Sequence, residues 1–263
     1  MKSVISICIT IVVVLTSTAL AEFNFDKIPK KLSAYYLANI QSIETVKEKL
    51  IANQFQILAI NKILDGEIVI TITNKELQST NSYMATLHIL VNKNRNEIRV
   101  QNPSYLGSAY IKGYRYGDFK ITVTRLEKVL GKIYPLLQQK YIKELPEYSF
   151  MFGMPHLEDV LTVANNRVDI PTKSILYSLK LPNGTTLVGH RLSRKTISFL
   201  KKIRQSRNAQ LLPYESMIKD GKATILDPKY YLALSLPNIS MGEFMRIATT
   251  PYSIEKEIEK SYR

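Results

Sequence analysis

Turn-forming residue pairs divide the strand-like segments of this chain into short hairpins. Residues 55–63 and 67–73 flank Asp65-Gly66, a dipeptide that favours the tight turn of a β-hairpin. The second of these segments alternates β-branched residues between its two faces, as a strand does. Further hairpins are predicted over residues 83–101, 174–189 and 210–226. A chain with this pattern is built largely from antiparallel strands.

Segments with helical spacing lie between these hairpins. Thr124 and Glu127 match a capping box, and the apolar residues that follow recur at helical spacing over 124–133. Other helices are predicted over 42–51, 155–164, 194–204 and 240–248, and single strands over 148–152 and 231–236. Because helices and hairpins are mixed in αββ and βα groups, the predicted class is α+β. A polar stretch closed by Pro146 suggests a first lobe over 22–145 and a second over 146–263.

Two internal similarities predict that the lobes are related. A strand is followed by Asn102-Pro103 and Tyr105 in the first lobe, and by Asp227-Pro228 and Tyr230 in the second. An Asx-Pro pair stops a strand and starts a turn or helix, because Asx accepts backbone hydrogen bonds and Pro fixes φ. Apolar residues also share one spacing in two segments: Leu157, Val160, Leu161 and Ala164, and Met241, Phe244, Met245 and Ala248. Generic local sequence preferences are the alternative explanation.

The second lobe resembles a known family. Phe152-Gly153-Met154-Pro155, a predicted helix, Asp169-Ile170-Pro171 and a hairpin follow one another over residues 148–200. This layout resembles the small bacterial α+β domains of the domain of unknown function 302 family. The chain departs from the family pattern at Met154, which replaces an Asn, and after Gly189, where no Asx-Pro follows. The resemblance implies a fold, and it implies no activity.

Residues 1–21 have the composition of a signal peptide. Lys2 is followed by an apolar run over 4–15 and by Ala19-Leu20-Ala21, an A-x-A cleavage site. The alternative is a transmembrane anchor, but the run is shorter than the roughly 20 residues that a span needs. We therefore expect a cleaved signal peptide and a periplasmic protein. Cys8 is the only cysteine and lies in this leader, so the mature chain would be cysteine-free.

The charge is strongly positive and unevenly distributed. The 263 residues include 36 Lys+Arg and 22 Asp+Glu, for a formal net charge of +14. From Ile170 to Tyr214 there is no acidic residue, whereas charge runs on solvated surfaces usually mix signs. We expect this span to face an anionic envelope component, namely a membrane surface, a glycan or an acidic protein; nucleic acid is excluded by the compartment. The candidate binding residues are Arg191, Arg194, Lys195, Lys201, Lys202, Arg204 and Arg207.

A second candidate segment is rich in Tyr and Gly. Residues 105–117 contain aromatic rings, cations and glycines that suit contacts with a glycan or a lipid headgroup. The alternative is that the rings cover an edge of the core. The candidate binding residues here are Tyr105, Tyr114, Arg115 and Tyr116.

The histidines give little support for catalysis. His88 is expected on a strand in an apolar setting, His156 in the first turn of a helix and His190 exposed at a strand end. No nucleophile, phosphate-binding or metal-binding motif occurs, so no catalytic residue, cofactor or metal is predicted. The leading hypothesis is a non-enzymatic binding module. The alternatives are an enzyme or ligand carrier with a site between the lobes at Tyr105, Tyr230 and the 152–156 turn, or an assembly through an exposed strand edge.

Overall fold

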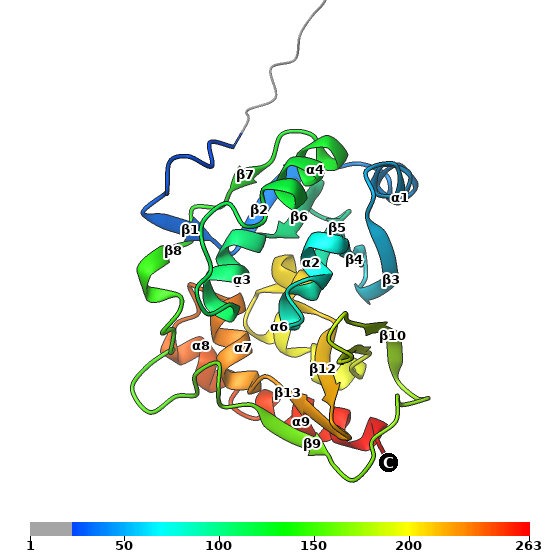
Figure 1. Cartoon of the computed structure of the whole chain (residues 1–263). Coiled ribbons are helices and arrows are strands. Elements are labelled where there is room, and N and C mark those ends of the chain that lie inside the picture. Colours follow the sequence, from blue (N-terminus) through cyan, green and yellow to red (C-terminus); the bar gives the residue numbers. More distant parts are fainter. Residues whose placement is uncertain (1–22) are drawn as a thin grey trace, which may run out of the picture.

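A computed structural model describes residues 23–263 and has an α+β architecture, as predicted (Figure 1). The signal-peptide prediction falls on residues outside the described part of the chain. Two antiparallel sheets, one of six strands and one of five, are accompanied by a small two-stranded sheet. Within residues 23–263, no helix is long and apolar enough to cross a membrane.

The six-stranded sheet has the order β3-β4-β5-β6-β2-β7. Its strands are β2 Tyr35–Asn39, β3 Gln56–Leu64, β4 Glu67–Thr73, β5 Leu87–Asn92, β6 Glu97–Gln101 and β7 Tyr134–Pro135. The helices around it are α1 Ile43–Ala52, α2 Lys75–Gln78, α3 Pro103–Tyr110 and α4 Lys120–Leu130, with a 3-10 helix η1 at Tyr83–Ala85. The small sheet pairs β1 Lys31–Ser33 with β8 Gln139–Tyr141, and a 3-10 helix η2 at Ile142–Glu144 follows.

The five-stranded sheet has the order β10-β11-β12-β13-β9. Its strands are β9 Leu161–Ala164, β10 Ile175–Lys180, β11 Thr186–His190, β12 Tyr214–Lys219 and β13 Lys222–Ile225. The helices of this part of the chain are α5 Arg194–Ile197, α6 Phe199–Lys202, the 3-10 helix η3 Ser206–Leu211, α7 Pro228–Ser235, α8 Met241–Arg246 and α9 Thr250–Ser261. Of these, η3 packs against strands β3 to β6 of the six-stranded sheet.

The two sheets share one arrangement of strands. In each, two consecutive hairpins are followed by a strand from earlier in the chain, as β3-β4-β5-β6-β2 and β10-β11-β12-β13-β9 show. Each second hairpin runs into an Asx-Pro helix start. Asn102 accepts a hydrogen bond from the backbone N–H of Ser104 at 2.9 Å, and Asp227 accepts one from Lys229 at 2.7 Å. Pro is tolerated in this first turn because its missing N–H would have no intrahelical partner there.

The lobes share one hydrophobic core, because a single cluster of buried apolar side chains includes residues of both sheets. The C-terminal end of α7 lies in this core. Its last carbonyl groups accept hydrogen bonds from tyrosines outside the helix. The hydroxyls of Tyr148, Tyr105 and Tyr35 donate to the carbonyls of residues 233, 234 and 235 at 3.1, 2.9 and 2.8 Å. These carbonyls have no partner within the helix, and leaving them unpaired in the core would destabilise the fold.

Three predicted elements are wrong. Residues 148–152 form no strand, and the predicted helix over 155–164 is a turn followed by strand β9. The Asp159 carboxylate accepts a hydrogen bond from the His156 backbone N–H at 2.8 Å and closes this turn. Residues 231–236, predicted as a strand, largely belong to α7, because Asp227-Pro228 starts a helix that continues through them.

Other helix predictions are correct in place but differ in detail. The helix predicted over 124–133 begins at Lys120, without the Thr124–Glu127 capping box, and ends before Gly131, whose φ is +77°. The basic helix predicted over 194–204 is two short helices, α5 and α6. The helix predicted over 240–248 is present as α8, and Ser240 and Glu243 form a capping box at its start.

Candidate functional site

A groove of about 580 Å³ lies between strand β3 of the first lobe and the segment from β11 to α6 of the second. Four cationic residues line it: Lys62, Arg191, Arg194 and Lys201. Three of these were candidate binding residues in the acid-free span, and Lys62 comes from the other lobe. The structure therefore adds a cation from the first lobe to part of the predicted basic surface.

The negative charge in the groove does not balance these cations. Asp65 is the one carboxylate among the described lining residues, and its Oδ1 lies 2.8 Å from Lys62 Nζ. Hydrogen bonding to Lys62 lowers the pKa of Asp65, and the charges of Lys201 and Arg194 lower it further. Arg191, Arg194 and Lys201 form no ion pair with another described residue. Positive charge is thus left uncompensated where the two lobes meet.

The groove is also lined by apolar side chains from both lobes. Ile60 on β3 is 43% exposed, while Leu192 and Ile197 are largely buried. The remaining apolar lining residues are Ile63, Leu64, Leu212 and Pro213. A concave surface with apolar walls and a few converging charged groups is the usual form of a ligand site, and such sites measure about 300–1,000 Å³.

The cations of α5 are held in place by a carboxylate of the last helix. Ser193 accepts a hydrogen bond from the Thr196 backbone N–H at 3.2 Å and so caps α5. Glu257 on α9 accepts hydrogen bonds from the Ser193 backbone N–H at 2.7 Å, from the Ser193 hydroxyl at 2.5 Å and from the Thr196 hydroxyl. A carboxylate at a helix start also complements the helix dipole. Glu257 therefore fixes the segment that carries Arg191 and Arg194.

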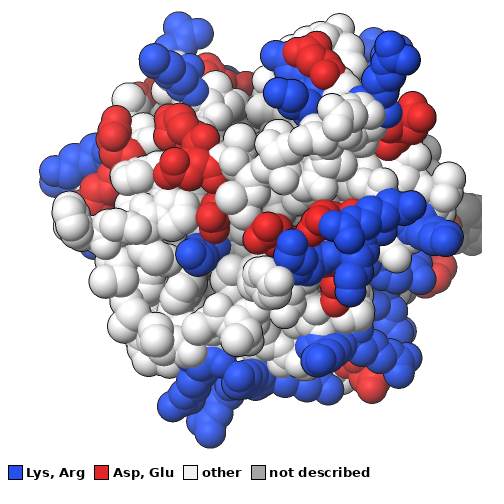
Figure 2. Space-filling model, turned by 90° about the horizontal axis from the view of Figure 1, so that it is seen from below, with Lys and Arg blue, Asp and Glu red and all other residues white. Residues whose placement is uncertain are grey.

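The other predicted basic residues lie elsewhere. Lys195 and Lys202 are exposed and do not line the groove. Arg204 and Arg207 line a smaller cavity of about 210 Å³ together with Arg99. Arg99 is buried and donates to Glu97 at 2.8 Å and to Asn208 at 2.9 Å. The structure therefore separates the seven predicted basic residues into distinct surfaces. Figure 2 shows the same uneven distribution on one face, where Lys and Arg gather in ridges near its right and lower margins.

The tyrosine-rich segment does not join the groove. Tyr105, predicted as a binding residue, is fully buried in α3 and donates to the Leu234 carbonyl, so it is unavailable to a ligand. Tyr114 stacks on Phe119 with ring centroids 5.8 Å apart, and Tyr116 packs against Phe25. These two tyrosines and exposed Arg115 line a separate hollow of about 710 Å³.

The alternative site between the lobes is not assembled as predicted. Tyr105 and Tyr230 are both buried in the core, whereas Phe152 is fully exposed on its turn. The turn over 152–156 lines a shallow surface hollow that contains neither tyrosine. Asn102-Pro103 and Asp227-Pro228 start helices α3 and α7. Tyr105 and Tyr230 lie on the buried faces of these helices and therefore point into the core.

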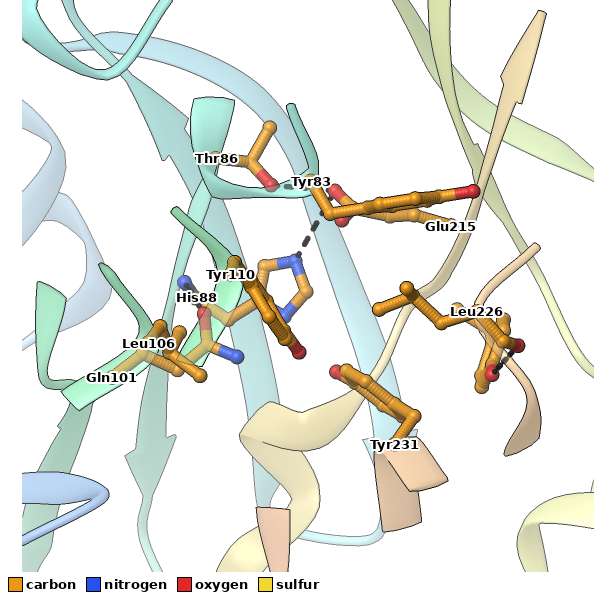
Figure 3. Close-up of a pocket in the computed structure, with 10 residues that line it drawn as sticks. Tyr83, Thr86, His88, Gln101, Leu106, Tyr110, Glu215, Leu226 and Tyr231 are labelled. Carbon is orange, nitrogen blue, oxygen red and sulfur yellow. Dashed lines mark hydrogen bonds and ion pairs between the residues drawn. The ribbon is translucent and has the colours of Figure 1, made fainter. Parts of the chain in front are cut away.

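A different polar cluster does lie between the lobes (Figure 3). Glu215 on β12 accepts hydrogen bonds from the Thr86 hydroxyl at 2.5 Å and from the Tyr177 hydroxyl. His88 on β5 places Nδ1 2.9 Å from the Gln210 carbonyl and Nε2 3.8 Å from Glu215 Oε1. Figure 3 shows His88, Tyr110 and Tyr231 pointing towards a common space. The His88–Glu215 pair was not found from sequence, since nothing in the chain links the two residues.

This enclosed cavity has a volume of about 20 Å³. A cavity of that size has room for about one water molecule. Two polar atoms at its wall, His88 Nε2 and the Tyr110 hydroxyl, have no hydrogen-bond partner among the described residues. The cluster is thus a buried polar contact between the lobes, and it is too small for an organic substrate.

The two other histidines lie outside this cluster. His190 was predicted to be exposed, which is wrong: it is buried, and Nε2 lies 2.6 Å from the Ser216 hydroxyl. Burial lowers the pKa of His190 to about 4. His156 lies in the turn before β9. Within residues 23–263, no group of three or more His, Cys, Asp or Glu side chains is arranged to hold a metal ion.

No family model, curated protein or solved structure matches this chain. The resemblance to the domain of unknown function 302 family therefore stays a prediction. Of the elements that carry it, the hairpin over 174–189 is present as β10 and β11, and the helix after Pro155 is not.

Proposed function

We propose that this protein is a binding module for an anionic envelope component, which it holds in the groove between β3 and the α5–α6 segment. The observation that carries the proposal is the convergence of Lys62, Arg191, Arg194 and Lys201 on one concave surface with a single, already paired carboxylate. The net positive charge comes from Arg191, Arg194 and Lys201, because Lys62 is paired with Asp65, and β3 of the first lobe supplies the facing wall of the groove. The leader sequence supports a periplasmic location.

Charge reversal tests the groove against a matched control on the same two helices. The double variant Arg194→Glu/Lys201→Glu changes groove residues, and Lys195→Glu/Lys202→Glu changes the net charge equally outside it. We expect the first variant to lose retention on phosphatidylglycerol vesicles at low ionic strength and the second to keep most of it. An exposed Lys or Arg contributes about 1 kcal/mol near an anionic surface, and this falls with added salt.

Two results would count against the proposal. Equal losses in both variants would indicate diffuse attraction by the net charge. If the wild-type protein is not retained on anionic vesicles, a membrane surface is not the partner of the groove.

We infer as well that the two lobes arose by duplication. Support comes from the shared strand order, from the Asx-Pro helix starts and from the register of the central hairpins. Val100 and Ile225 each stand two residues before the Asx, and they pair with Ile89 and Ser216. This register makes β5 the counterpart of β12, and β3 the counterpart of β10.

A further inference from the structure

The groove has a counterpart on the other side of the lobe interface. The hairpin turns Asp65-Gly66 and Asn183-Gly184 correspond, and both glycines have positive φ, +75° and +84°. The first turn lies beside the α5–α6 segment, since Asp65 shares the groove with Arg194 and Lys201. The second lies beside the loop after α2, since the Asn183 backbone N–H donates to Asn81 Oδ1 at 3.0 Å. Each hairpin therefore meets the other lobe at an equivalent place, the groove at the first turn and its counterpart at the second.

The counterpart crevice is filled by apolar side chains. Ala85, Leu179, Leu181 and Leu187 form a buried cluster, and Leu58 and Tyr83 pack against it. Counted back from the two turns, Leu181 corresponds to Ile63 and Leu179 to Asn61. One crevice is thus closed by leucines, while the other stays open over about 580 Å³.

The open crevice differs from a simple anion site in its apolar walls. Ile60 is 43% exposed there, and the largely buried Leu192 and Ile197 also line the groove. An inorganic anion would contact the Lys and Arg head groups and leave the Ile60 side chain in contact with water. Covering apolar surface contributes about 25 cal/mol per Å², so a ligand with an alkyl part gains affinity from the same walls.

We propose that the ligand of this groove is an amphiphilic anion with a single alkyl chain. Its head group lies against Arg191, Arg194 and Lys201, and its chain lies along Ile60, Leu192 and Ile197, where leucines fill the counterpart crevice. This inference rests on the proposed function, because it assigns a ligand class to the same groove.

Calorimetric titration of the full mature chain with inorganic phosphate, butyl phosphate and octyl phosphate, kept monomeric, tests the proposal. Full burial of one methylene raises affinity by about four-fold. We therefore expect octyl phosphate to bind at least about ten-fold more tightly than butyl phosphate even with partial burial. Decanoate, used in parallel, shows whether a carboxylate head group is accepted in place of a phosphate.

Two variants test where the alkyl chain of the ligand binds. Ile60→Asn should reduce the difference in affinity between butyl and octyl phosphate, because Ile60 lines the part of the groove that is assigned to the alkyl chain. Ile51→Asn is the matched control, because Ile51 is 65% exposed on α1 and does not line the groove. Circular dichroism of both variants confirms folding, and Ile60→Ala provides a milder substitution at the same position. Arg194→Glu/Lys201→Glu should weaken every anion in the series.

The outcomes separate this inference from the proposed function. Equal affinity for inorganic and octyl phosphate would overturn the assignment of an amphiphilic ligand, while the groove would still bind anions. Binding of no anion in the series would overturn both. If octyl phosphate binds tightly and Ile60→Asn does not weaken it, the alkyl chain of the ligand lies outside the groove, and the inference is overturned.

Discussion

His88 and Glu215 occupy corresponding positions in the two lobes and face each other across the interface. Val100 and Ile225, each two residues before the Asx, pair with Ile89 and Ser216. His88 and Glu215 directly precede these partners, and His88 Nε2 lies 3.8 Å from Glu215 Oε1. The polar pair therefore lies where β5 of the first lobe meets β12 of the second.

Removing the Glu215 carboxylate should destabilise the fold. Glu215→Ala leaves the hydroxyls of Thr86 and Tyr177 without their acceptor in a buried setting. A buried polar group left unpaired costs about 1–3 kcal/mol, and urea unfolding measures the loss. Glu48→Ala on the exposed face of α1 is the control and should change stability little. An unchanged midpoint for Glu215→Ala would show that the interface does not depend on this cluster.

Tyr105→Phe should destabilise the protein by about 1–2 kcal/mol, because it leaves the Leu234 carbonyl at the end of α7 without a donor. The ring stays in place, so the core packing is preserved. Thermal unfolding measures the effect. Tyr252→Phe is the control, since that side chain is 62% exposed. Equal melting temperatures for the two variants would contradict the role of the hydroxyl.

Stability should fall on acidification between about pH 6.5 and about pH 4. Burial lowers the pKa of His190 to about 4, against an ordinary value of about 6.5. In that window the unfolded chain binds the proton and the folded chain does not, so stability is present above the unfolded pKa and is lost as pH falls towards the folded one. The loss amounts to about 3 kcal/mol at most. His190→Gln should flatten the urea midpoint against pH in this window; an equally steep curve would assign the dependence to other groups.

Glu257→Gln should weaken vesicle retention although it makes the protein more positive. The carboxylate holds Ser193 and Thr196 at the start of α5, and the neutral amide cannot accept all three of these hydrogen bonds. Arg191 and Arg194 then lose their fixed position in the groove. Glu255→Gln on the same helix changes the charge equally and should leave retention unchanged or raise it. A gain in retention for Glu257→Gln would mean that charge alone governs binding.

The local elements that the sequence predicts well are those with short-range causes. Asp65-Gly66 gives the β3–β4 turn, and Ser240 with Glu243 caps α8, because both devices act within a few residues. Residues 231–236 place Leu at every second position, which is typical of a strand, but the Asp227-Pro228 helix start continues through them. In that segment the cap and the core decide the backbone conformation.

The groove could be predicted only in part, for a different reason. The acid-free span contains Arg191, Arg194 and Lys201, but it also contains Lys195 and Lys202, which do not line the groove. Which side of a short helix faces a partner depends on tertiary packing, here on Glu257 of a distant helix. Lys62 joins the groove from the other lobe, and no spacing along the chain reports that approach.

The three tyrosine hydroxyls at the end of α7 have a consequence for the chain as a whole. Two of them, from Tyr35 and Tyr105, belong to the half that is synthesised first, and they satisfy carbonyls in the half that follows. Neither half made alone has its complete set of hydrogen bonds, so each supplies the other's missing partners. Two separately produced halves should therefore regain native structure only when they are mixed, in the manner of fragment complementation.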